Sequence, residues 1–445
     1  MSSSSARREC LRISNQLRMS DERLDVVIFG ATGFTGKYAV QEAQRIHKDM
    51  PFTWGIAGRR KEALQSVLQE FASNSNNVKI IIADLRDEVS LRKMCQQAKV
   101  VVNCCGPYRF YGEPVIKACI ESKTHHVDVS GEPEYMERMQ LEYNKAAEEA
   151  GIYVVSACGF DSIPFEMGIA FTDDKFSGQV NSIETYLSGW LTSDVGGAVL
   201  HHGTWESALH HLANESELAA LRRKLYPDKL PEFKPVLKTR SFIHRNPASP
   251  GYSVVFPGPD LSVALRTQRF MFERYKVRPI QVQTYVTFRS LWQLTKVAVI
   301  GGMSTVLSKC RCGLSLLTKH PKFFSWGLAS HEGPKEEIMD NTHFSITFLA
   351  KGWTEKLTDP TDQYKEPPNK ELVTKVTGVN PAYGLTNTTL LISALMIVKE
   401  SYRMPGSGGV LSPGAAFAKT SMVDDLMKYD LKFEIVSSKI KQNER

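Results

Sequence analysis

The sequence is poor in cysteine and lacks the motifs of several well-known enzyme classes. Its eight cysteines include no Cys-x-x-Cys pair and form no disulfide framework, so we expect no metal site and a reducing compartment. The chain also contains no His-Glu-x-x-His motif, no nucleophile elbow of the Gly-x-Ser-x-Gly type and no usefully placed Tyr-x-x-x-Lys. These absences argue against metallopeptidases and serine hydrolases.

Long hydrophobic runs are scarce as well. No secretory signal segment is present, and the apolar stretch Val297–Leu307 is too short to cross a bilayer, which takes roughly 20 residues. Residues 297–326 suit contact with a lipid-droplet or membrane surface, while a buried core helix or a dimer-contact helix explains the run equally well. The basic and aromatic residues on which the surface hypothesis depends are Lys296, Lys309, Arg311, Lys319, Lys322, Phe323, Phe324 and Trp326.

Charge of either sign is not strongly in excess. The net charge of +7 over 445 residues is modest, so we expect no nucleic acid partner; a phosphate-bearing cofactor or an anionic membrane face would account for it. With 42% hydrophobic and 23% charged residues, the chain has the composition of a globular protein. Its length is sufficient for two or three domains. For residues 1–22 we favour a disordered tail, or a start at Met19, over a mitochondrial transit peptide.

A glycine-rich turn follows the apolar run Leu24–Phe29. The segment Gly30-Ala-Thr-Gly-Phe-Thr-Gly36 leads from a predicted strand into a predicted helix. Backbone without side chains can approach a pyrophosphate closely, and a helix N-terminus offers free N–H groups and partial positive charge. The pattern therefore predicts a dinucleotide site. We assign cofactor binding here to Gly30, Thr32, Gly33, Phe34, Thr35 and Gly36.

The second predicted strand, Phe52–Ala57, ends in Gly58-Arg-Arg60. NAD-binding proteins usually have an acidic residue near this place, which binds the ribose hydroxyls. Two arginines and no acid stand here, which favours the 2′-phosphate of NADP(H) over NAD(H). We therefore add Arg59 and Arg60 to the predicted cofactor site.

Apolar strands alternate with helical patterns as far as Ser156. Such alternation predicts a doubly wound parallel sheet of Rossmann type, with ligands at the carboxyl ends of its strands. The strands are predicted to end at Phe29, Ala57, Ala83, Cys104, Val129 and Ser156. From these ends Asp84, Cys105, Gly106 and Pro107 join the predicted cofactor site.

The pattern changes at about residue 166. Ile280–Phe288 and Phe344–Ala350 alternate apolar and polar residues, which is typical of half-covered antiparallel strands. We expect a second domain of α+β type with a largely antiparallel sheet. Ala382–Ser401 is rich in leucine, isoleucine and methionine and predicts a long helix.

Two side chains are candidates for proton transfer beside a nicotinamide. Tyr108 follows the fourth strand, although a tyrosine beside Pro107 is at least as often structural. Asp161 follows the sixth strand, and its carboxylate suits a helix N-cap better than a catalytic role. The adjacent pair His201-His202 is weaker evidence.

These motifs together resemble the saccharopine dehydrogenase-like oxidoreductases of animals, from about residue 24 to the C-terminus. The matching segments are Val26–Gly36, Ala57–Arg59, Asn103–Val115, Asp128–Pro133, Gly159–Pro164, Gly203–Trp205 and Gly408–Phe417. The N-terminal pattern also resembles bacterial trans-acting enoyl reductases. The resemblance implies a nicotinamide cofactor, association with lipid droplets or other membranes, and a split Rossmann domain. Its parts would be 23–165 and 381–445, with 166–380 inserted.

We therefore expect an NADP(H)-dependent oxidoreductase of a lipid-related or other hydrophobic carbonyl, enoyl or imine substrate. The alternative is a cofactor-binding lipid-droplet or scaffold protein with little or no turnover. The expected location is a lipid droplet or an intracellular membrane surface, with mitochondria as the alternative. The inserted domain is a candidate surface for a homodimer.

Overall fold

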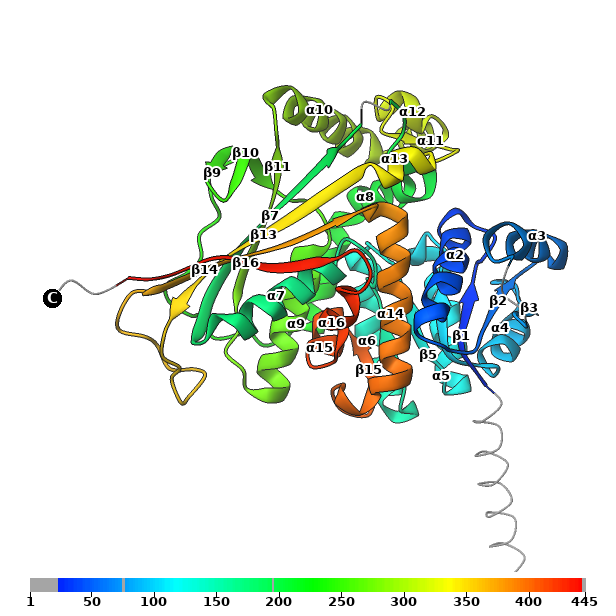
Figure 1. Ribbon diagram of the computed structural model, residues 1–445, viewed down its shortest axis with the longest axis horizontal. Coiled ribbons are helices and arrows are strands. Elements are labelled where there is room, and N and C mark those ends of the chain that lie inside the picture. The colour runs from blue at the N-terminus through cyan, green and yellow to red at the C-terminus, as the bar shows by residue number, and fades with distance from the viewer. Residues whose placement is uncertain (1–22, 74–76, 194–195, 442–445) are drawn as a thin grey trace, which may run out of the picture.

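Two seven-stranded sheets organise the protein (Figure 1). The computed structural model describes residues 23–73, 77–193 and 196–441. In the first sheet all neighbouring strands are parallel, in the order β15-β6-β5-β4-β1-β2-β3. Its strands are β1 (Leu24–Phe29), β2 (Trp54–Gly58), β3 (Lys79–Ile82), β4 (Ala98–Asn103), β5 (His125–Asp128), β6 (Tyr153–Val155) and β15 (Gly409–Leu411).

The predicted Rossmann-type sheet is confirmed. The strand order reverses between β1 and β4, which places a crevice for ligands at their carboxyl ends. The strands are short and apolar, and β1 is fully buried from Val26 to Phe29, as expected for a sheet with helices on both faces. The connecting helices are α2 (Phe34–Asp49), α3 (Lys61–Phe71), α4 (Glu88–Cys95), α5 (Tyr108–Ser122), α6 (Pro133–Ala150) and α7 (Ile163–Phe176).

The second sheet has the order β16-β14-β13-β7-β11-β10-β9. Its long strands β7, β13 and β14 pair antiparallel, as the alternating pattern predicts. The one parallel pair in the described part of this sheet joins β7 and β11, so the antiparallel prediction for Ile280–Phe288 is wrong on that side of β11 and correct on the side of β10. A long crossover separates β7 from β11 and lets them run parallel. The strands are β7 (Gln179–Leu191), β9 (His244–Asn246), β10 (Ser249–Val255), β11 (Gln281–Phe288), β13 (Thr342–Trp353), β14 (Lys370–Val379) and β16 (Lys432–Ile440).

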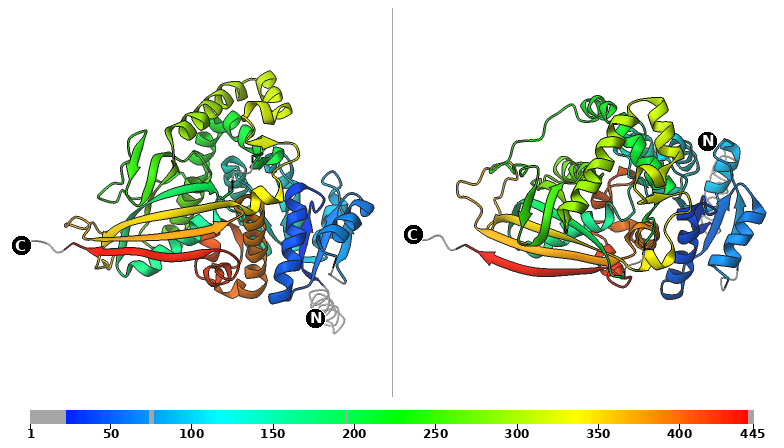
Figure 2. Two further views of the ribbon diagram at one scale, coloured as in Figure 1. Left: turned by 45° about the horizontal axis from the view of Figure 1, so that its top comes forward. Right: turned by 90° about the horizontal axis from the view of Figure 1, so that it is seen from above.

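Smaller elements cover this sheet and connect it to the first. The short strands β8 (Leu200–His201) and β12 (Ala329–Ser330) pair with each other. The helices are α8 (His202–Leu225), α9 (Asp260–Tyr275), α10 (Leu291–Ser308), α11 (Arg311–Lys319), α12 (Pro321–Phe324) and α13 (Glu336–Asp340). Figure 2 shows that α10, α11 and α12 gather on one side of the molecule.

The helix α14 (Thr386–Glu400) returns the chain to the first sheet. It packs against α2, β4 and β5, and a π-helical turn, η1 (Pro381–Leu385), precedes it (Figures 1 and 2). The segment Pro381–Arg403 is long and apolar enough to cross a membrane, but 72% of its most apolar window is buried inside the protein. It is therefore a core helix, close to the predicted range Ala382–Ser401.

The C-terminal segment does not belong to the Rossmann domain alone. The strand β15 extends the first sheet beside β6, with Gly409 opposite Tyr153. After α15 (Pro413–Phe417) and α16 (Met422–Leu426), however, β16 pairs with β14, with Phe433 opposite Val376. The predicted return of all of 381–445 to the Rossmann domain is wrong for β16, because this strand pairs with β14 and Phe433 buries its side chain against Phe171 of α7.

The burial of α14 makes a stability prediction. Leu395 is completely buried, so Leu395→Ala should leave a cavity and lower the free energy of unfolding by about 3 kcal/mol. Tyr402→Ala is the matched control, because this side chain, just after α14, is 81% exposed. Urea unfolding of both variants measures the difference, and equal effects would contradict the assignment of α14 to the core.

Candidate active site

The glycine turn joins β1 to α2 by a very close approach of backbone to backbone. A Cβ atom at Gly36 would lie 2.2 Å from the carbonyl oxygen of Gly30, and Gly30 has a φ of +83°. Gly33 is the N-cap of α2 and has no side chain to cap it, and the first turn carries no acid. The first N–H groups of α2 and its partial positive charge therefore remain available to an anion. Thr32 and Gly33 are exposed.

Phe34 has a different role from the predicted one. Its ring stacks on His201, with 4.4 Å between the ring centroids, and meets the edge of Tyr383 at 4.7 Å. The Nδ1 atom of His201 accepts a hydrogen bond from Gly203 and so caps α8. The Phe34 side chain thus packs the glycine turn against the second domain, and only its main chain stays with the predicted cofactor site.

Arg59 and Arg60 follow β2, the strand next to β1. Both side chains are exposed, and within the residues that the structure describes neither guanidinium has a hydrogen bond or an ion pair. Burial raises the pKa of the Cys105 thiol to about 12, and the positive charge of Arg59 opposes this rise. A Cβ atom on Gly30 would lie 2.6 Å from the Cys105 sulfur. The positive charge of Arg59 is therefore close enough to the glycine turn to influence the pKa of the adjoining Cys105 thiol.

The other predicted cofactor residues lie at neighbouring strand ends. Asp84 follows β3, and its Oδ1 atom accepts a hydrogen bond of 3.0 Å from the main-chain N–H of Arg86. This bond gives Asp84 a structural role in the turn. Gly106 and Pro107 follow β4, where Gly106 is exposed and Pro107 is the N-cap of α5.

Tyr108 does not point into a cleft. It begins α5, and its side chain is buried. Its hydroxyl donates a hydrogen bond of 2.9 Å to the carbonyl oxygen of Asn103, and burial raises its pKa well above the ordinary value. The predicted catalytic role is therefore wrong, because the proton is already engaged and the ring is enclosed by the core.

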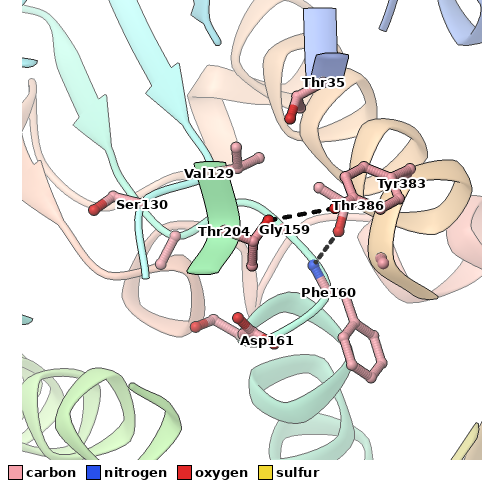
Figure 3. Close-up of a pocket in the computed structure, with 12 residues that line it drawn as sticks. Thr35, Val129, Ser130, Gly159, Phe160, Asp161, Thr204, Tyr383 and Thr386 are labelled. Carbon is pink, nitrogen blue, oxygen red and sulfur yellow. Dashed lines mark hydrogen bonds between the residues drawn. The ribbon is translucent and has the colours of Figure 1, made fainter. Parts of the chain in front are cut away.

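A cavity of about 100 Å³ lies at the carboxyl edge of the first sheet. Thr35 at the start of α2 and Asp161 before α7 lie on opposite sides of it in Figure 3. Thr386 accepts a hydrogen bond of 3.1 Å from the main chain of Phe160. The full lining is Thr35, Val129, Ser130, Ala157, Gly159, Phe160, Asp161, Ser162, Thr204, Ala382, Tyr383 and Thr386.

Four lining residues, Thr204, Ala382, Tyr383 and Thr386, come from segments that the site prediction did not include. Thr204 lies in the first turn of α8, and the Tyr383 hydroxyl is 3.4 Å from its Oγ1 atom. Tyr383 and Thr386 come from η1 and α14. The signal that could have pointed to Thr204 is the Gly-Thr-Trp motif. Nothing local marks the other three, because they lie more than 300 residues from the glycine turn in the sequence.

Asp161 is exposed to this cavity and does not cap α7. Ser162 is the N-cap of that helix, and neither residue donates or accepts a side-chain hydrogen bond within the described residues. Burial of the carboxyl among protein atoms raises the pKa of Asp161. The cap interpretation is therefore wrong, and a carboxyl group that holds its proton more tightly than usual faces the cavity.

A second carboxyl, that of Asp260, lies near Asp161. Asp260 is buried, and its Oδ1 atom has no hydrogen-bond partner among the described residues. Burial raises its pKa well above the ordinary value, and the negative charges of Asp161 and Glu166 raise it further. No group of three or more His, Cys, Asp and Glu side chains in the described part of the chain is arranged to hold a metal ion.

Two buried carboxylates shape the loops around the cavity. Asp128 accepts hydrogen bonds from the main chain of Ser130 and Ala157 and from the Ser156 hydroxyl, which joins the ends of β5 and β6. Burial outweighs these bonds and raises its pKa to about 6. Glu132 accepts hydrogen bonds from the main-chain N–H groups of Tyr108 and Arg109, at the start of α5. Both carboxylates belong to the Asp-Val-Ser-Gly-Glu motif, which is the sequence feature that could have identified them.

Comparison with known proteins agrees with this geometry. The profile of the saccharopine dehydrogenase NADP binding domain matches residues 26–155. A human protein named saccharopine dehydrogenase-like oxidoreductase is 38% identical over 423 residues, which cover 93% of this chain and 97% of the relative. The chain belongs to the saccharopine dehydrogenase-like oxidoreductase family.

Other relatives in this family and one solved structure add to the comparison. A Caenorhabditis elegans protein named lipid droplet localized protein is 32% identical, over 93% of this chain and 99% of its own length. Among solved structures, saccharopine dehydrogenase (L-Glu forming) from Saccharomyces cerevisiae superposes with a TM-score of 0.53 at 17% identity, covering 93% of this chain and 99% of the yeast chain. This likeness confirms the fold. The matched NADP binding domain contains β1 to β6 and the glycine turn.

The position of Tyr108 makes a prediction. Tyr108→Phe removes the hydrogen bond to Asn103 and should lower the free energy of unfolding by about 1 kcal/mol. NADPH affinity, measured by cofactor fluorescence, should not change, because the hydroxyl lies in the core. A large loss of turnover in a variant that folds normally would restore the catalytic interpretation.

Proposed function

We propose that this protein is an NADP(H)-dependent oxidoreductase of a hydrophobic, lipid-related carbonyl, enoyl or imine substrate, and that it works at a lipid-droplet or membrane surface. One observation carries the proposal. A single cavity adjoins the start of α2 at Thr35 and a carboxyl group free of hydrogen bonds at Asp161. The first belongs to a dinucleotide-binding turn and the second can hold a proton.

The residues at the glycine turn fit NADP(H). The open N–H groups of α2 suit a pyrophosphate, since its helix N-terminus has neither a capping side chain nor an acid. Arg59 and Arg60 are unpaired within the described residues and would bind the 2′-phosphate. NADP(H), when bound, supplies or accepts the hydride. The protein has to hold the substrate beside it and manage the proton.

We assign proton transfer to and from the substrate to Asp161. Its raised pKa keeps a larger fraction of the carboxyl protonated as the pH rises. From the cavity wall the carboxyl would donate its proton to a substrate atom that becomes basic on reduction, and would accept it back in the reverse direction. Phe160, Val129 and Tyr383 contribute apolar surface to a cavity whose lining is otherwise mostly polar, and they would contact the apolar part of a substrate.

The lipid location is supported by the nematode relative's name and by the surface described in the next subsection. The mitochondrial alternative depends on residues 1–22, which lie outside the described residues, and stays a prediction. Tight NADPH binding with no consumption of NADPH across a panel of enals, ketones and imines would favour the scaffold alternative over an enzyme.

The phosphate assignment predicts a change in cofactor preference. Arg59→Asp should weaken NADPH binding by about tenfold to a hundredfold, because it replaces a charge-assisted phosphate contact by repulsion. NADH, which has no 2′-phosphate, should lose less than about threefold. Titrations followed by cofactor fluorescence measure both affinities, with Lys145→Asp, an exposed change on α6, as the control. Equal losses for the two cofactors would contradict the assignment.

The proton assignment predicts a pH effect. Turnover by reduction should fall as the pH rises through the raised pKa of Asp161, and Asp161→Asn should lower turnover by about a hundredfold and remove this dependence. The raised pKa also means that the charged carboxylate costs stability above that pH. The Asn variant should therefore melt at a higher temperature than the wild type at alkaline pH. An unchanged pH profile in the variant would rule out the role.

A further inference from the structure

The helices α10, α11 and α12 form a compact unit with its own small core, which we call the α10–α12 unit (Leu291–Phe324). Figure 1 shows the three helices together, beside α8. The inner sides of these helices are buried against α8 and β12. The buried cluster consists of Trp205, Leu209, Ile300, Leu317, Phe324 and Ala329. The side chains on the outer side of the unit are therefore not required for its packing.

The outer side of the α10–α12 unit exposes large apolar side chains. Trp292 is 70% exposed, Val306 72% and Phe323 75%. Further exposed apolar residues of this segment are Leu291, Val297, Val299, Leu316 and Trp326. The buried-core interpretation of the run Val297–Leu307 therefore holds only for its inner side, where Ile300 is buried, because Val297, Val299 and Val306 are exposed. A concentration of exposed apolar side chains in one short segment is typical of an interaction site.

The chain segment that forms this surface carries charge of one sign. Between Glu273 and Glu332 the chain has no acidic residue, but nine lysines and arginines. Five of these basic residues belong to the α10–α12 unit, and none of the five has an ion pair within the described part of the chain: Lys296, Lys309, Arg311, Lys319 and Lys322. The surface combines exposed aromatic rings with an excess of positive charge, which complements anionic phospholipid headgroups above an acyl layer.

We propose that the α10–α12 unit docks on a phospholipid surface with anionic headgroups, into which Trp292, Val306 and Phe323 insert. The lysines and arginines of the unit bind the headgroups. This inference locates the lipid contact of the proposed function and rests on that part of it alone, since it does not depend on NADP(H) or on Asp161.

The same unit is attached to the wall of the cavity. The indole N–H of Trp205 donates a hydrogen bond of 3.0 Å to the Leu317 carbonyl oxygen, and the His202 ring nitrogen lies 3.1 Å from the Thr318 carbonyl oxygen. Between His202 and Trp205, Thr204 lines the cavity. One helical turn of α8 thus joins the cavity to the docking surface, so docking holds the cavity close to the lipid.

Flotation with vesicles tests the proposal. The full chain should float with vesicles of phosphatidylcholine containing about 30% phosphatidylserine and much less with phosphatidylcholine alone. Binding should weaken in about 0.5 M salt, because salt screens the headgroup contacts. Absence of binding to the anionic vesicles would overturn the proposal, and NADPH binding by the same sample would leave the oxidoreductase proposal intact.

Two double variants separate the apolar and the charged contributions. Trp292→Gln with Phe323→Gln, and Lys319→Glu with Lys322→Glu, should each lower the vesicle partition coefficient by about tenfold or more. All four side chains are exposed, so NADPH binding and melting temperature should not change. Tyr402→Gln and Lys145→Glu are matched controls at exposed positions outside the unit and should bind vesicles like the wild type.

The variants also distinguish other occupants of the surface. Wild-type binding by both double variants, or equal losses in the controls, would overturn the proposal. So would a wild-type dimer in light scattering that becomes a monomer in the Trp292/Phe323 variant, because the surface would then be an interface between two copies of this chain.

Discussion

The close contact of Gly36 with Gly30 is the constraint on which the arrangement of this protein depends. The two backbones approach so closely that a side chain at Gly36 would lie 2.2 Å from the Gly30 carbonyl oxygen. This contact sets the direction in which α2 leaves the sheet and opens its N-terminus to the crevice. It also places Phe34 where His201 and Tyr383 can pack on it. Cofactor site and domain packing therefore share one short turn.

The parts of the fold that could be predicted are those that depend on local sequence patterns. The apolar strands, the glycine turn and the arginines after β2 each depend on a few neighbouring residues, and the parallel sheet follows from their alternation with helices. The period-2 segments likewise indicated the second sheet. At the site, the sequence pointed to Thr35 and Asp161, which line the cavity, and to the strand ends that surround it.

What could not be predicted depends on contacts between distant segments. The side chain of Tyr108 turns into the core because the Asn103 carbonyl oxygen is there to accept its hydrogen bond. Asp161 resembled a helix cap because the local sequence around it suits one; only its exposure to the cavity shows otherwise. Thr204 and Tyr383 meet across 179 positions of sequence, and β16 selects the second sheet through Phe433. The periodicity of a local segment does not predict contacts between residues so far apart in the sequence.

The division of the C-terminal segment between the two sheets affects how the protein is made. The first sheet lacks its edge strand β15 and its buried helix α14 until residue 411 has been synthesised, and the second lacks β16 until residue 440. Neither sheet is therefore complete, and the apolar surface that α14 covers stays open, until synthesis of the chain is almost finished.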